Sequence, residues 1–174
     1  MEKVFKDLKV YYSGSVKGVP EKDPEFVWEL VQYLIKNGAD VLSEHVSGRN
    51  QEEKDQIFAK NTGKTIKEIK NDSQLQFTIR SQDIKWVDQA THVIALVNSP
   101  SLGVGMEIQR AIDKTKLGMN ETPILCLVRQ DIFPKLSFMI KGISSQESPK
   151  FKLSVYKDLE EAKKHIFNFL SETK

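Results

Sequence analysis

The chain has 174 residues, which is enough for one domain with a buried core. Its composition, 39% hydrophobic and 29% charged with 9 Gly and 6 Pro, is that of a globular protein and excludes the disordered and fibrous classes. The 26 basic and 24 acidic residues nearly balance, which argues against a long nucleic acid as partner. A ligand with one phosphate remains compatible with this charge, because it needs only a local site.

Cysteine content and the N-terminal residues narrow the class further. Cys126 is the only cysteine, so we expect no intrachain disulfide and no Cys-rich zinc site, and its apolar surroundings favour a packed thiol over a nucleophile. Residues 1–7 lack the apolar core of a signal peptide, and no apolar run approaches the roughly 20 residues that span a bilayer. We therefore expect a cytosolic protein without a membrane partner, and a nuclear location stays open.

The first part of the chain alternates short strands with a helix. Residues 8–12 form a strand pattern that runs into a predicted turn over 13–15. A helix follows, with Asp23 as a good N-cap, apolar residues repeating every four positions, and Asn37-Gly38 as its end. A second short strand is predicted at 41–42.

The rest of the chain continues the alternation. The stretch 48–72 is charged and weakly patterned, and we expect a surface helix and a loop there. Residues 93–97 form a continuous apolar run, typical of a parallel strand buried on both faces. The other predicted elements are a helix over 77–90, a helix from about 103 to 111, a strand over 123–128, a short helix over 136–140, a strand over 151–156 and an amphipathic helix over 159–170.

Five strands alternating with helices predict an α/β fold. The expected architecture is a five-stranded parallel, doubly wound sheet in a single domain over residues 1–174. Such sheets bind ligands at the carboxyl ends of their strands, near the switch point in strand order. A candidate site residue should therefore follow a strand directly or face that edge.

One candidate group follows the first strand, and its members are Gly14, Ser15, Val16, Lys17 and Gly18. The two glycines allow close backbone approach, while Ser15 and Lys17 can donate hydrogen bonds to an anion. The pattern is neither a P-loop nor the dinucleotide-binding fingerprint. A plain turn between a strand and a helix explains these residues as well as a phosphate site does.

A second group follows the apolar strand over 93–97. Gly103 and Gly105 expose backbone N–H groups at the predicted start of a helix, which is a natural anion site. Glu107 falls within the first turn or so of that helix, near the same edge. Taken alone, it is better explained as an acid that complements the helix dipole.

The third candidate is Asp83, which projects from the apolar side of its predicted helix, beside Trp86 and Val87. Such a position tends to raise the pKa of a carboxyl group, which makes it a proton donor near neutral pH. A structural acid paired with Arg80 or a backbone N–H is an equal alternative. Two carboxylates and an anion site at one edge favour glycoside-type chemistry, in which one carboxylate attacks the sugar and the other acid assists the leaving group.

Five segments, in this order along the chain, resemble the nucleoside 2-deoxyribosyltransferase family and within it the 2′-deoxynucleoside 5′-monophosphate N-hydrolases. The most specific is Pro-Ser-Leu-Gly-Val-Gly-Met-Glu, placed after an apolar strand. The segments are 10–15, 43–46, 82–86, 100–107 and 136–142.

The resemblance implies a flavodoxin-like, Rossmann-like fold, a homodimer, and no metal or organic cofactor. It implies that Glu107 attacks the anomeric carbon and forms a glycosyl-enzyme that water hydrolyses. Asp83 would assist departure of the base, and Tyr11 would orient the nucleophile.

The resemblance also implies a binding set for the substrate. The loop over 14–18 and Ser101 would hold the 5′-phosphate, and Ser137 would come from the neighbouring subunit. His45 matches a position near the base or sugar, although a lone histidine is as often structural. Gly103 and Met139 complete the implied set.

The expected function is hydrolysis of a nucleoside 5′-monophosphate to a free base and a (deoxy)ribose 5-phosphate. Lys17 stands where close relatives tend to have Arg, and the stretches 48–72 and 115–122 are longer, so the base and the sugar's 2′ position stay open. Two alternatives remain: a transferase that passes deoxyribose between bases, and a nucleotide-binding module without catalysis.

Overall fold

The computed structural model describes residues 3–15, 25–43, 48–65, 68 and 75–174. Its strands are β1 (Lys9–Gly14), β2 (Asp40–Val41), β3 (His92–Leu96), β4 (Ile124–Arg129) and β5 (Phe151–Tyr156). They form one five-stranded sheet in the order β2-β1-β3-β4-β5, and every neighbouring pair is parallel. The predicted parallel α/β sheet is therefore confirmed.

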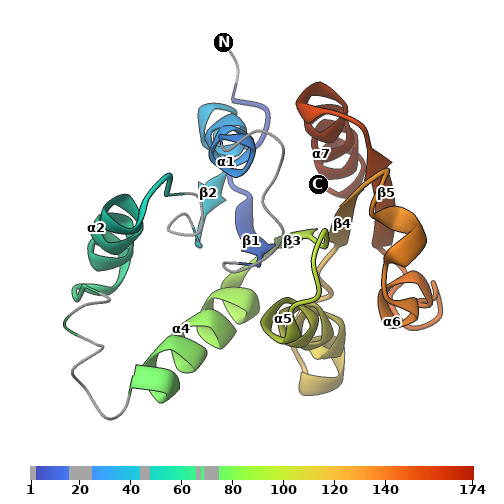
Figure 1. Cartoon of the computed structure of the whole chain (residues 1–174). Helices are drawn as coiled ribbons and strands as arrows, with labels where there is room; N and C mark the ends of the chain where they lie inside the picture. Colours follow the sequence, from blue (N-terminus) through green and yellow to red (C-terminus); the bar gives the residue numbers. More distant parts are fainter. Residues whose placement is uncertain (1–2, 16–24, 44–47, 66–67, 69–74) are drawn as a thin grey trace.

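Helices cover both faces of this sheet (Figure 1). On one face, α1 (Phe26–Lys36) and α7 (Leu159–Thr173) pack on side chains such as Tyr12 and Leu125. On the other face, α4 (Leu75–Gln89), α5 (Leu102–Asp113) and the short α6 (Phe138–Lys141) enclose a second core that includes Tyr11. All residues of β3 are buried, because a central strand is covered on both sides.

The strand order places a switch point between β1 and β3. These two strands are neighbours, yet the chain leaves β1 toward α1 on one face and leaves β3 toward α5 on the other. In sheets of this kind, connections that diverge in this way mark the ligand-binding edge. The fold thus brings the ends of β1 and β3 to the place where such sheets bind ligands.

The end of β1 corrects the prediction. Ser13 and Gly14 pair with Ala95 and Leu96 of β3, so the turn predicted over 13–15 is wrong at these two positions, which belong to the strand. Pairing with a neighbouring strand outweighs the turn preference of these residues. Since side chains alternate along a strand, Ser13 lies on the same face as Tyr11.

The short helix predicted over 136–140 is also displaced. A 3₁₀ helix occupies Phe133–Lys135, and α6 begins only at Phe138. The Ser137 side chain accepts a hydrogen bond from the Met139 N–H at 3.2 Å, which makes Ser137 the N-cap and sets the start of α6.

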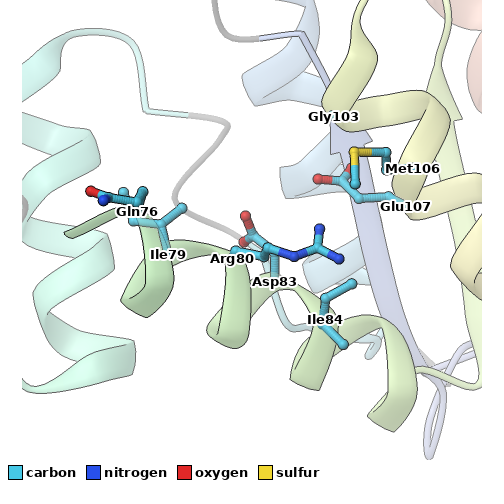
Figure 2. Close-up of a pocket in the computed structure, with 8 residues that line it drawn as sticks. All are labelled: Gln76, Ile79, Arg80, Asp83, Ile84, Gly103, Met106 and Glu107. Atoms are coloured by element: carbon cyan, nitrogen blue, oxygen red, sulfur yellow. The ribbon is translucent and has the colours of Figure 1, made fainter. Parts of the chain in front are cut away.

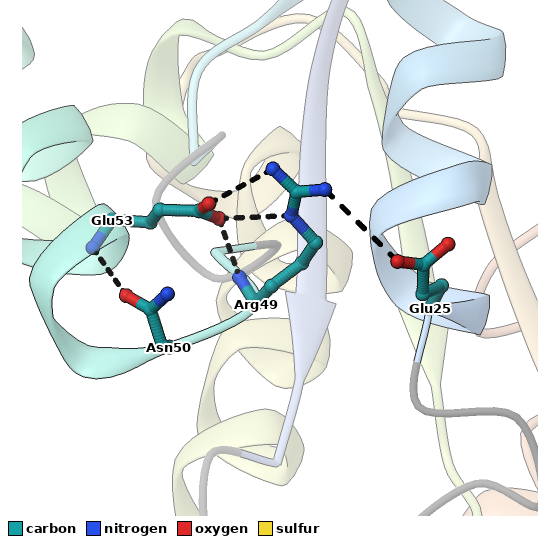
Figure 3. Close-up of polar contacts among 4 residues, drawn as sticks. All are labelled: Glu25, Arg49, Asn50 and Glu53. Atoms are coloured by element: carbon teal, nitrogen blue, oxygen red, sulfur yellow. Dashed lines mark hydrogen bonds and ion pairs between the residues drawn. The ribbon is translucent and has the colours of Figure 1, made fainter.

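The charged stretch after residue 48 contains α2 (Gln51–Thr62), as predicted. Asn50 caps it by accepting from the Glu53 N–H, and Arg49 binds the Glu53 carboxylate with both its backbone and its guanidinium (Figure 3). The same guanidinium lies 4.0 Å from Glu25 at the start of α1. Phe58 is buried against Trp86 of α4, so α2 is joined to the core on this side.

Other sequence predictions have mixed outcomes. Asn37 caps the end of α1, and Gly38 follows with φ 99°, a backbone conformation that glycine adopts readily. The predicted N-cap Asp23 lies outside the described residues. Cys126 is buried in β4, and burial raises the pKa of its thiol to about 12, which agrees with a packed thiol. Of the helices that the structure describes, none has the length and apolarity to cross a bilayer.

Candidate active site

A pocket of about 430 Å³ lies between α4 and α5, on the face of the sheet opposite to α1. The side chains of the two helices face each other across it (Figure 2). Its lining consists of Gln76, Ile79, Arg80, Asp83 and Ile84 from α4, and Gly103, Met106 and Glu107 from α5.

The packing of α5 directs Glu107 inward. Ser101 caps the helix by accepting from the Val104 N–H at 3.4 Å, and the buried stripe that includes Val104, Ile108 and Ala111 rests on the sheet. Glu107 is three positions after Val104 and four before Ala111, so it lies at the border of that stripe. The side chain is therefore held between the sheet and the pocket.

Two side chains of β1 bind the Glu107 carboxylate. The Ser13 hydroxyl donates to Glu107 Oε2, and the Tyr11 phenol forms a second side-chain hydrogen bond with the same carboxylate. The first turn of α5 contains no acidic residue, because Glu107 lies in the second turn. The interpretation of Glu107 as a complement to the helix dipole is therefore wrong.

Ser13 is a residue of the candidate site that the sequence interpretation did not assign. The sequence predicts a turn at this position, and a turn does not define the direction of the Ser13 side chain. The signal that identifies it is the two-residue spacing from Tyr11 within a strand, since both side chains then project from one face.

Asp83 and Glu107 share the pocket but differ in their surroundings. Burial and the neighbouring charge of Glu107 raise the pKa of Asp83 from 3.8 to about 7. Burial also raises the pKa of Glu107, while the hydrogen bonds from Ser13 and Tyr11 oppose that rise by stabilising the carboxylate. These surroundings favour ionisation of Glu107 before Asp83, and a pKa of about 7 leaves Asp83 partly protonated at neutral pH.

The predicted pairing of Asp83 with Arg80 or a backbone N–H is not observed among the residues that the structure describes. Its carboxyl group is partly buried and has no ionic partner among the described residues, which is costly unless the group stays neutral. The alternative interpretation of Asp83 as a paired structural acid is therefore wrong as far as the described residues are concerned.

Tyr11 remains a neutral donor. Burial, followed by the charges of Glu107 and Asp83, raises the pKa of its phenol well above the ordinary 10.0. The buried Tyr11 hydroxyl therefore keeps its proton and can donate it in a hydrogen bond to Glu107.

Four predicted binding residues lie at or next to the carboxyl edge. Gly14 ends β1 and Ser15 follows it, while Ser101 and Gly103 belong to the start of α5, after the neighbouring β3. Among the described residues, a Cβ added at Gly103 would meet only Ser101 Oγ, at 3.9 Å, so there is space beside this position in the first turn of α5.

Two other predicted residues are described by the structure, and neither lines this pocket. Ser137 and Met139 are exposed on and before α6, outside the pocket lining. The predictions for Val16, Lys17, Gly18 and His45 fall outside the described residues.

Several lining residues were missed, notably Gln76, Arg80 and Met106. Their spacing could have identified them. Gln76, Arg80 and Asp83 are three or four positions apart and so lie on one side of α4, and Met106 is next to Glu107 on α5. Among the described residues, no three His, Cys, Asp or Glu side chains are grouped so that they could hold a metal ion.

Comparison with known proteins gives relatives and a structural neighbour. No protein-family model matches the chain. A Trichoplax adhaerens protein that carries the name 2′-deoxynucleoside 5′-phosphate N-hydrolase 1 is 35% identical over 133 residues, 76% of this chain and 74% of that protein. The 5-hydroxymethyl-dUMP N-hydrolase of Tetraodon nigroviridis is 34% identical over 141 residues, 81% of this chain and 84% of its own length.

A solved structure supports the fold. The CMP N-glycosidase of Clostridium botulinum superimposes with a TM-score of 0.58 over 92% of this chain and 98% of that one. The two sequences are 15% identical, so this likeness shows a common fold.

Proposed function

Because the chain belongs to the family of 2′-deoxynucleoside 5′-phosphate N-hydrolases and is an N-glycosidase, we propose that it hydrolyses nucleoside 5′-monophosphates through a covalent bond to Glu107. The products are a free base and a (deoxy)ribose 5-phosphate. The observation that carries the proposal is the pair of carboxyl groups in one pocket, whose surroundings favour ionisation of Glu107 before Asp83.

In the first step Glu107 acts as the nucleophile. A carboxylate oxygen forms a bond to the anomeric carbon while the bond from that carbon to the base nitrogen breaks. The hydrogen bonds from Tyr11 and Ser13 orient the carboxylate and support its ionised form. Asp83 donates its proton to the departing base, which therefore leaves as a neutral molecule.

In the second step the roles of the carboxyl groups change. Asp83, now ionised, takes a proton from water, and the water oxygen bonds to the anomeric carbon. The bond between that carbon and Glu107 breaks and the carboxylate is restored. A pKa of about 7 suits Asp83 to both directions of proton transfer.

The phosphate is proposed to lie at the carboxyl edge. Gly14 ends β1 and Ser15 follows it, while Ser101 and Gly103 belong to the start of α5, which follows the neighbouring strand β3. The first turn of α5 offers backbone N–H groups and the positive end of the helix dipole. We also propose that Lys17 binds the phosphate and that His45 lies near the base or sugar, as the resemblance implies.

The active unit is proposed to be a homodimer in which Ser137 of one subunit completes the phosphate site of the other. Ser137 is exposed beside Phe138 and Met139, whose side chains are 86% and 81% accessible. Apolar side chains as exposed as these are typical of an interface. The cytosolic location stays a prediction from the sequence.

Deoxyribosyl transfer is the second candidate function. It would use the same Glu107 intermediate but would require a second base instead of water. The proposed phosphate site argues against it, because such a site is useful only for a phosphorylated substrate. Binding without catalysis fits less well, because it gives no role to an acid of raised pKa that shares the pocket with Glu107.

The decisive experiment incubates the protein with a panel of ribo- and deoxyribonucleoside monophosphates and measures released base by chromatography. We expect release of base and sugar phosphate, and a loss of at least about 1,000-fold in Glu107→Ala, as for removal of a nucleophile. Trapping the sugar on Glu107 in rapid-quench mass spectrometry tests the covalent step. A folded Glu107→Ala protein with full activity would contradict the assignment.

A labelled free base added to the same reaction separates the two candidate enzymes. Incorporation of label into nucleotide identifies a transferase. Binding of a monophosphate without turnover over hours would identify the non-catalytic module.

A further inference from the structure

Arg80 is the only basic side chain among the described residues that line the pocket. It lies on α4 three positions before Asp83, so both side chains project from the same side of the helix. Figure 2 shows its guanidinium extending from α4 across the pocket, toward the side where Glu107 lies. Within the described part of the chain it has no hydrogen bond or ion pair, so its donors are available to a ligand.

The orientation of the substrate brings Arg80 next to the base. The proposed phosphate residues Gly14, Ser15 and Ser101 lie at the ends of β1 and β3, whereas Asp83 lies on the opposite wall, on α4. A sugar with its anomeric carbon at Glu107 and its phosphate at the strand ends directs its base toward α4. Arg80 is therefore adjacent to the leaving group.

The chemistry of arginine favours one class of base. A guanidinium has five N–H donors and no acceptor, so it can bind an exocyclic carbonyl oxygen but not an exocyclic amino group. As the glycosidic bond breaks, its electron pair passes to the base, and conjugated carbonyl oxygens take part of the negative charge until Asp83 delivers its proton. A fixed positive donor at such an oxygen stabilises the transition state more than the bound substrate.

We propose that Arg80 determines base specificity by donating to an exocyclic carbonyl oxygen of the leaving base. The protein then prefers nucleotides with oxo-pyrimidine or oxo-purine bases over those with the corresponding amino group. This inference rests on the proposed function and adds the substrate class to it.

Two matched substrate pairs test the proposal: deoxyuridine against deoxycytidine monophosphate, and deoxyinosine against deoxyadenosine monophosphate. Each pair differs in one exocyclic group, oxo or amino, at the same ring position, and in the adjacent ring nitrogen, which carries a proton only beside the oxo group. We expect the wild-type protein to favour the oxo member of each pair in kcat/KM by roughly 10- to 100-fold. In Arg80→Gln the ratio should fall toward one, because a carboxamide both donates and accepts, and Arg80→Lys should keep part of it.

Lys85→Gln is the matched control, since Lys85 is exposed on the same helix outside the pocket lining and the variant loses the same charge. Its oxo-to-amino ratio should equal that of the wild type. Arg80 is also exposed at the pocket, so its variants should fold, and their circular dichroism and melting temperature verify this.

The outcomes are distinct. An unchanged ratio in Arg80→Gln, an equal loss with all four substrates, or a wild-type preference for amino bases overturns the assignment. An equal loss would identify a contact to a part common to all substrates, such as the phosphate. A wild-type protein that releases no base from any of them contradicts the proposed function, and the inference falls with it.

Discussion

Glu107 and Asp83 carry the same functional group in two different environments. Glu107 receives hydrogen bonds from Ser13 and Tyr11, whereas Asp83 is buried near another negative charge and has no described donor. The difference separates their pKa values, so that one carboxyl group is ionised while the other holds a proton. Acid and nucleophile are thereby assigned by the surroundings and not by residue type.

The pKa of Asp83 predicts the alkaline side of the pH–rate profile. Asp83 must be protonated to assist the leaving base, so we expect kcat/KM to fall as pH rises through about 7. At lower pH the activity should fall again as Glu107 becomes protonated. Asp83→Asn should lose roughly 100-fold or more in kcat/KM and should lack the alkaline decline. An alkaline limb that persists unchanged in this variant would assign it to another group.

The same shift predicts a stability effect. Folding moves the pKa of Asp83 from 3.8 to about 7, so between these values the folded protein binds more protons and its stability decreases as pH rises. Asp83→Asn removes this decrease in stability, because a carboxamide does not ionise. At pH 8 we expect urea unfolding to show a gain of roughly 2 to 4 kcal/mol over the wild type, and at pH 4 only a small difference.

Asp40→Asn is the control for that measurement, because Asp40 is an exposed carboxylate on β2. It should change stability by less than about 0.5 kcal/mol at either pH. An equal gain for Asp83→Asn at pH 4 and pH 8 would mean that the effect does not come from ionisation.

At the scale of elements, two contacts hold α5 against α4. Arg110 binds Asp88 through two hydrogen bonds of 2.8 Å, and the buried Lys114 donates to the carbonyl oxygens of Val87 and Ala90 at 3.2 and 2.8 Å. Carbonyls at the end of a helix have no donor within the helix, and Lys114 supplies one to Ala90 and a second one to Val87, which also accepts from the Ala90 N–H. These contacts therefore stabilise the arrangement in which the helices of Asp83 and Glu107 face each other.

The substitution Lys114→Met tests the contribution of Lys114 to this helix–helix contact. The methionine keeps the apolar stem but removes the described donor to the Ala90 carbonyl oxygen and one of the two donors to the Val87 carbonyl oxygen, so we expect a loss of about 2 kcal/mol in the free energy of unfolding by urea. Lys116→Met is the control, because its ion pair with Asp113 is exposed and should contribute less than about 1 kcal/mol. Equal effects of the two substitutions would contradict a structural role for Lys114.

At the scale of the whole molecule, large apolar side chains remain exposed at the starts of α5 and α6. Leu102 is 91% accessible, Phe138 86% and Met139 81%. Burying side chains of this size contributes roughly 1.5–3 kcal/mol each, which is enough to favour association of subunits. The proposed homodimer would cover them and bring Ser137 to the neighbouring site.

Phe138→Glu tests the proposed dimer. We expect light scattering after size exclusion to show a dimer for the wild type and a monomer for the variant, with at least about tenfold lower activity, because a buried unpaired charge disfavours the interface. Leu117→Glu, which changes an exposed apolar residue after the far end of α5, should remain dimeric and active. A wild-type monomer with full activity would contradict the proposal.

The sequence by itself determined the alternation of strands and helices, the parallel sheet, the placement of Glu107 after β3 and the apolar setting of Asp83. These features follow from local periodicity and from the rule that parallel strands present their carboxyl ends at one edge. The similarity of short segments then indicated the reaction class. Element ends were less accurate, as Ser13, Gly14 and the start of α6 show, because strand pairing and capping decide them.

Which side chains contact one another depends on how the helices and strands pack. Ser13 reaches Glu107 across 94 positions of the chain, and the pKa of Asp83 depends on a charge carried by another helix. The position of Arg80 at the pocket likewise depends on how α4 packs against α5. Burial and distance between elements govern hydrogen bonds and electrostatic interactions, and neither quantity is a property of a local segment.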